Sequence, residues 1–92
     1  MKFDKRKSPV IQFIGKVENR SIEAIKNGDE ATLFHNGKLI AARITLQKQN
    51  QFTGVITNSP YAPSQYPEFA VGKEIYFLED DIFLIRKSSQ EN

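Results

Sequence analysis

The sequence predicts an all-β fold, or a β-rich one with a single short helical turn, built from about five to six short strands. Apolar runs are brief, and turn residues separate them at roughly 8–12-residue intervals, which is typical of small sandwiches and barrels. The favoured architecture is a small SH3-like barrel or a strongly bent antiparallel sheet. A split sheet that carries one helix is the alternative.

The composition indicates one folded, cytoplasmic domain. Hydrophobic residues make up 39% of the 92 residues and charged residues 26%, which is ordinary for a globular chain. There is no cysteine, so we expect neither disulfides nor a thiolate metal site. No apolar run approaches the ~20 residues that cross a bilayer, and no signal peptide is recognisable. We expect a basic, flexible N-terminal arm over 1–8, one domain over 9–87 and a polar tail over 88–92.

Two short elements are predicted near the N-terminus. Residues 10–17 are rich in β-branched and aromatic side chains and contain Gly15 as a candidate bulge or bend. Residues 21–26 begin with serine and place two isoleucines three positions apart, which predicts one helical turn. Asn27 and Gly28 end that turn.

The strongest local signal is Asn36-Gly37. Both residues tolerate the positive φ that a type I′ turn requires, so 30–35 and 38–44 are predicted to form a hairpin with a two-residue loop. The turn sets the register: His35 with Lys38, Phe34 with Leu39, Leu33 with Ile40, Thr32 with Ala41, Ala31 with Ala42, and Glu30 with Arg43. The face with Leu33 and Ile40 is predicted to be the core side, and the other face carries Phe34, Leu39 and the opposite charges of Glu30 and Arg43.

The second half is predicted to contain three more strands and a long loop. Residues 52–57, 73–78 and 82–85 are the strands, with an acidic turn at Asp80-Asp81 before the last one. Residues 58–67 contain three prolines and two tyrosines. Because proline fits neither a helix interior nor a central strand, this stretch is predicted to be a loop.

Residue types that carry catalysis are scarce. His35 is the only histidine and lies beside the predicted turn, with no cysteine to pair with it, so no nucleophile and base are brought together. Glu79, Asp80 and Asp81 lack the ligand spacing of a calcium loop and are interpreted as a solvated turn. The glycines are isolated from one another, so no phosphate-binding loop is expected. We predict no enzymatic activity, no metal and no cofactor; a hydrolase or transferase is the remaining alternative.

Aromatic residues favour a binding function. Tyr61 and Tyr66 stand in the proline-stiffened loop and Phe69 follows closely; tyrosine is enriched at interfaces because it offers a large area with one polar tip. With Phe34 and Leu39 as apolar neighbours, these residues are the candidate contact surface for a protein partner. The alternative is that the loop folds over one end of the barrel and its rings seal the core.

Positive charge supports a competing class, the nucleic-acid binders. The net charge is only +2, but basic residues cluster at the start of the chain, where they can neutralise phosphates. The aromatic rings could stack on unpaired bases. The candidate phosphate contacts are Lys2, Lys5, Arg6, Lys7, Lys38 and Arg43. The alternative for the N-terminal cluster is a solubilising, frayed terminus.

Residues 52–60 and 69–77, followed by Ile82, show an aromatic-x-Gly strand, an Asn-x-Pro turn and a Gly-charged-x-Ile strand. This pattern resembles the YegJ-like small bacterial domains of unknown function over roughly residues 31–85. The resemblance implies a bacterial or phage-borne β-rich domain and transfers no catalytic residue. We therefore predict a non-catalytic binding module, accessory or inhibitor-like, with a protein partner and no membrane contact, either monomeric or an edge-paired homodimer.

Overall fold

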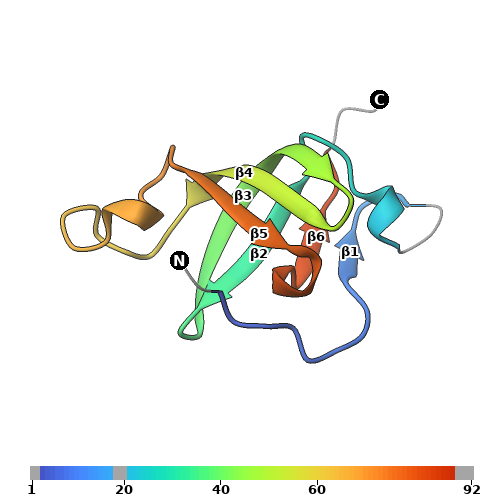
Figure 1. Ribbon diagram of the computed structural model, residues 1–92, viewed down its shortest axis with the longest axis horizontal. Helices are drawn as coiled ribbons and strands as arrows, with labels where there is room; N and C mark the ends of the chain where they lie inside the picture. The colour runs from blue at the N-terminus through green and yellow to red at the C-terminus, as the bar shows by residue number, and fades with distance from the viewer. Residues whose placement is uncertain (1–2, 18–20, 89–92) are drawn as a thin grey trace.

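The computed structural model describes residues 3–17 and 21–88 (Figure 1). These residues form six strands and three short 3-10 helices: β1 (Gln12–Ile14), η1 (Ile22–Ala24), β2 (Glu30–His35), β3 (Lys38–Lys48), β4 (Gln51–Asn58), η2 (Pro67–Phe69), β5 (Glu74–Leu78), η3 (Glu79–Asp81) and β6 (Leu84–Arg86). The predicted all-β class and the helical turn near residue 22 are confirmed. Within the described ranges, no helix has the length and hydropathy to cross a membrane.

All six strands belong to one sheet, in the order β1-β6-β2-β3-β4-β5. The sheet curls so that β5 passes across β2 in Figure 1, but its edge strands β1 and β5 do not pair, so it remains open. Of the two predicted forms, the structure therefore has the strongly bent sheet and not a closed barrel. One pairing also differs from the predicted antiparallel arrangement, because β1 runs parallel to β6.

The β2–β3 hairpin has the predicted register at all six residue pairs. Asn36 and Gly37 adopt φ of 51° and 78°, as a type I′ turn requires. Leu33 and Ile40 are fully buried on the core side. Side chains alternate along a strand, so Phe34 and Leu39 lie on the opposite, outer face.

A bulge in β3 reverses this alternation further along the strand. The pairing of β3 with β4 shifts between Ile44 and Leu46, which leaves Thr45 as an extra residue in β3. This bulge lets the Ile44 and Leu46 side chains point to opposite faces of the sheet. Ile44 is buried while Leu46 is 56% exposed. An unbroken strand would have placed both side chains on one face.

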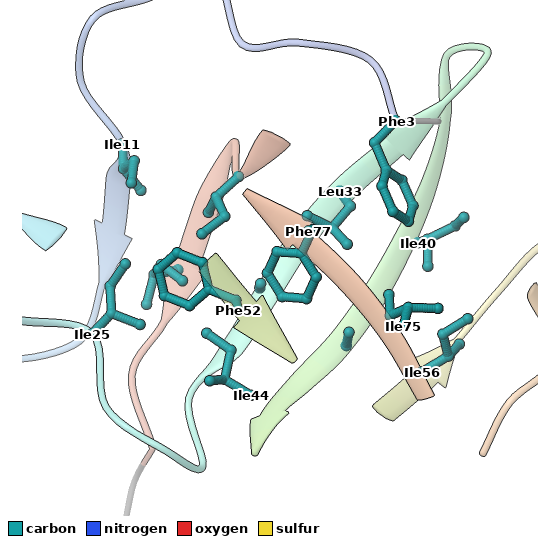
Figure 2. Packing of buried hydrophobic residues seen from close by; sticks show 14 of the residues in the cluster. Phe3, Ile11, Ile25, Leu33, Ile40, Ile44, Phe52, Ile56, Ile75 and Phe77 are labelled. Atoms are coloured by element: carbon teal, nitrogen blue, oxygen red, sulfur yellow. The ribbon is translucent and has the colours of Figure 1, made fainter. Parts of the chain in front are cut away.

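The core fills the space inside the bend (Figure 2). In Figure 2, Phe77 of β5 lies over Leu33 of β2, and Phe52 packs beside it. The Phe52 and Phe77 rings are stacked with centroids 5.6 Å apart. Phe3 also belongs to this cluster, so the start of the described chain contributes to the core.

Residues 3–8 are part of the folded unit, which differs from the predicted flexible arm. The Asp4 N–H donates to Phe34 O (2.8 Å) and the Arg6 N–H donates to Asp80 O (2.7 Å). Burial of Phe3 fixes the segment at its first described residue. Lys2 lies outside the described residues.

Asp29 joins the start of β2 to the end of the described chain. Its buried carboxylate accepts hydrogen bonds from the Lys26 N–H and the Ser88 N–H, each at 2.9 Å, and lies 2.6 Å from Lys87 Nζ. The Lys87 ammonium also donates to Ala24 O. The buried charge is therefore both paired and hydrogen-bonded.

Candidate binding groove

An open groove of about 1030 Å³ lies on the outer face of the sheet. Its floor is formed by β2, β6, the start of β3 and Phe83, and one wall is the N-terminal segment. The residues that line it are Asp4, Lys5, Arg6, Lys7, Ser8, Val10, Gln12, Thr32, Phe34, Leu39, Phe83, Leu84 and Arg86.

The floor is apolar at the hairpin end. The Phe34 ring meets the Phe83 ring edge-on, with centroids 4.8 Å apart, an arrangement that aromatic pairs prefer. Leu39, opposite Phe34 in the hairpin, is 45% exposed. The Phe83 N–H donates to Thr32 O, and this bond holds the chain leading into β6 against β2.

Asp4 fixes the N-terminal wall to the hairpin turn. Its carboxylate accepts hydrogen bonds from the Asn36 N–H (3.2 Å) and the Gly37 N–H (2.8 Å). A carboxylate that accepts from backbone N–H groups makes charge-assisted hydrogen bonds, which are stronger than neutral ones. The wall and the turn are therefore held as one unit.

Arg6 and Lys5 attach the same wall to η3, and we call these contacts the charge clasp. The Arg6 side chain is almost fully buried; its Nη1 donates to Glu79 O (2.8 Å) and Ile82 O (2.7 Å), and its Nη2 lies 3.2 Å from Glu79 Oε2. Lys5 Nζ lies 2.8 Å from Asp81 Oδ1 and 3.2 Å from Asp80 Oδ1.

The charge clasp joins two features that lie far apart in the sequence, the basic N-terminal residues and the acidic turn. The hydrogen bond of the Lys5 ammonium to Asp81 is the main reason that the Lys5 pKa is raised above its ordinary value. Desolvation opposes this shift, and the hydrogen bond to Asp80 adds to it. Because both cations are already neutralised within the chain, Lys5 and Arg6 have structural roles. Their predicted part in phosphate binding has no geometric support.

Exposed positive charge lies at the edges of the groove. Lys7 is exposed and lines the N-terminal wall. Arg86 is 59% exposed, and its Nε is 3.8 Å from Glu30 Oε1. The other Glu30 oxygen accepts from Thr57 Oγ1 (2.9 Å). Glu30 thus forms its ion pair with Arg86, and not with Arg43 as predicted, although Arg43 lies opposite it in the register.

The aromatic residues of the predicted contact loop pack on the protein itself. Phe69 is 1% exposed, so it is a core residue and not a contact residue. Tyr61 stacks on Phe69 with ring centroids 5.1 Å apart and donates from Oη to His35 O (2.8 Å). The Tyr61 pKa is raised, chiefly by desolvation and secondarily by Tyr66 and Asp4. Tyr66 remains 40% exposed.

The structure separates the two halves of the predicted contact surface. His35 and Tyr61 lie at the core side of the hairpin tip, where Lys38 Nζ is 5.8 Å from the centre of the Tyr61 ring. Phe34 and Leu39 occupy the outer side, because neighbouring residues of a strand point to opposite faces. Only Phe34 and Leu39 of the predicted contact residues line the groove.

A second, smaller hollow of about 450 Å³ is lined by residues of β3, β4 and β5. Leu46, Tyr76 and Leu78 expose apolar surface there. The Tyr76 hydroxyl donates to Glu74 Oε1 (3.0 Å), and this hydrogen bond is the main reason that the Tyr76 pKa is raised. The charge clasp does not border this hollow.

Sequence reasoning missed Phe83, Val10 and Leu84 as groove residues. Each of them stands in an apolar run of the sequence that is typical of a core strand. They come together only through the bend of the sheet and the path of residues 4–10. Within residues 3–17 and 21–88, no three histidine, cysteine, aspartate or glutamate side chains gather in a way that could hold a metal ion. No protein-family model, curated protein or solved structure matches the chain.

Proposed function

We propose that this protein is a non-catalytic binding module of the cytoplasm, accessory or inhibitor-like, and that its groove receives a protein partner. One observation carries the proposal: an open groove of about 1030 Å³ whose floor presents Phe34, Leu39 and Phe83. Ligand sites are typically concave, with apolar and aromatic linings and a few polar groups that set orientation. Its bacterial or phage origin, and the YegJ-like resemblance, remain part of the same proposal.

The form of the groove favours a peptide segment over a small molecule. The groove is open along the sheet. Its apolar floor and polar rim resemble the apolar centre and polar rim of a typical protein interface. Aromatic anchors near the centre of such surfaces contribute most of the binding free energy. Leu39 is the most accessible apolar side chain of the floor, so it is the residue to change.

The test is selection of random peptides displayed on phage against the intact chain, followed by affinity measurements with Leu39→Asp. Leu46→Asp is the matched control, because Leu46 is also an exposed leucine of β3 but lies outside the groove. We expect Leu39→Asp to weaken the selected peptides at least about tenfold and Leu46→Asp to leave them bound.

Two results would overturn the proposal. One is a selection that yields no peptide able to bind the free chain. The other is a set of peptides that bind Leu39→Asp as tightly as the natural chain, which would place their contact elsewhere. Circular dichroism spectra of both variants show whether the fold is retained.

Nucleic-acid binding is the second candidate function, and the exposed positions of Lys7, Arg43 and Arg86 favour it. Phosphate contacts release counterions, so affinity would fall steeply as salt rises. Fluorescence anisotropy with labelled single-stranded and duplex oligonucleotides at low and physiological salt tests this class. Salt-sensitive binding that Arg86→Gln weakens would favour nucleic acid over a peptide.

A further inference from the structure

We infer that the groove recognises an extended peptide in which a large apolar side chain and a carboxylate stand four residues apart. The apolar side chain would lie against Phe34 and Leu39, and the carboxylate would bind Arg86. This inference rests on the proposed function, since it names the chemistry of the segment that the groove receives.

The spacing follows from the register of β2 with β6. Phe34 and Glu30 are four residues apart on β2, and Glu30 is paired with Arg86. A strand rises about 3.3 Å per residue, so the two ends of the groove floor are about 13 Å apart. An extended peptide spans the same length in four residues, and its side chains at i, i+2 and i+4 point the same way.

The middle of the floor restricts the residue between these two positions. Thr32 of β2 is paired with Leu84 of β6 between the Phe34 end and the Arg86 end. Both side chains are half-buried and line the groove. This row offers a methyl-rich surface without a charge, which fits a small or aliphatic residue at i+2.

Charge complementarity identifies the group at the far end. Within the described residues, nothing accepts a hydrogen bond from Arg86, and its closest acidic neighbour is the Glu30 oxygen 3.8 Å from Nε. The guanidinium therefore retains donors that can form a bidentate pair with a carboxylate. Lys7 on the wall and Arg43 beyond Glu30 add exposed positive charge, so a partner with acidic side chains is attracted and a basic one is repelled.

The alternative occupants are less well matched. A purely apolar segment would leave the positive rim without a partner, and a basic segment would place like charges beside Arg86 and Lys7. Glu30 offsets only part of this charge, because it is paired in the register with both Arg43 and Arg86, and this row therefore holds one acidic and two basic side chains.

The experiment uses the peptides selected on the intact chain. Each is synthesised with its acidic residue and again with the matching amide, Asp to Asn or Glu to Gln. Both forms are titrated by fluorescence anisotropy into the natural chain, Arg86→Gln and the control Lys48→Gln, since Lys48 is an exposed cation of β3 outside the groove. We expect the amide form to bind the natural chain and Lys48→Gln about tenfold more weakly than the acidic form.

With Arg86→Gln the two peptide forms should bind alike, because the partner of the carboxylate is gone. The selected sequences should also place the acid four residues from the apolar side chain. The inference fails if the acid and amide forms bind the natural chain equally, or if the difference persists in Arg86→Gln. In either case, if Leu39→Asp still weakens peptide binding, the proposed function stands. If Leu39→Asp has no effect on peptide binding, both the proposed function and this inference fail.

Discussion

Single side chains hold distant parts of this small fold together. Asp29 bonds the chain before β2 to the residues after β6, and Asp4 bonds the N-terminal wall to the hairpin turn. Arg6 does the same between the wall and η3. Each of these groups is polar, yet each binds backbone groups that would otherwise be left without partners in a partly buried position.

Asp29→Ala should lower the free energy of unfolding by about 3–5 kcal/mol, because it leaves the enclosed Lys87 ammonium without its carboxylate and two backbone N–H groups without an acceptor. Urea denaturation followed by circular dichroism measures the change. Glu23→Ala is a suitable control, since Glu23 is an exposed acid of η1. A loss below about 1 kcal/mol would show that the Asp29 pair has no net stabilising role.

The sequence alone does not predict which charged side chains bind distant parts of the same chain. The basic N-terminus and the acidic turn were each visible as charge, but their pairing depends on a fold that brings Lys5 beside Asp80 and Asp81. Charge alone does not distinguish a solvated lysine from one bound to its own chain. The same holds for Phe69, whose apolar ring suits a contact surface and a core equally well.

At the scale of elements, local chemistry predicted more. The β2–β3 register followed from Asn36-Gly37 because the turn type determines which residues face each other. The bulge between Ile44 and Leu46 has no such signal, and neither does the parallel pairing of β1 with β6. Both depend on contacts between segments far apart in sequence. For Phe34 and Leu39 the hairpin register was enough to place them on the outer face.

The loop after β4 gives a prediction that separates its two tyrosines. Tyr61→Ala should lower the free energy of unfolding by about 2 kcal/mol, because it removes a half-buried ring and the hydrogen bond to His35 O. Tyr66→Ala should cost less than about 1 kcal/mol, since its ring is more exposed. Thermal and urea unfolding of both variants provide the comparison. Equal effects would contradict the packing of Tyr61 on the core.

For the whole molecule, the main feature is how an open sheet protects its core. The strands β1 and β5 leave the sheet unclosed. The segment of residues 3–8 runs from the hairpin turn to η3, and its Phe3 ring points into the core (Figure 2). The same segment forms the wall of the groove. Stability and the candidate binding site therefore depend on one stretch of chain.

A chain that lacks residues 1–8 should lose at least about 3 kcal/mol of unfolding free energy, because a buried phenylalanine and the buried Arg6 contacts are removed. It should also lose the peptides selected on the full chain. A chain that lacks residues 1–2 alone serves as the control. Unfolding curves that coincide for the full chain and the chain without residues 1–8 would show that the segment does not support the core.

The position of β6 between β1 and β2 also has a consequence for synthesis on the ribosome. β1 emerges before the other five strands, yet within the described residues it pairs with β6 alone, at residues 84–86. The β2–β3–β4 meander can pair as it emerges, because its contacts are local. β1 cannot form this pairing until residues 84–86 have been made, so its addition to the sheet follows formation of the meander.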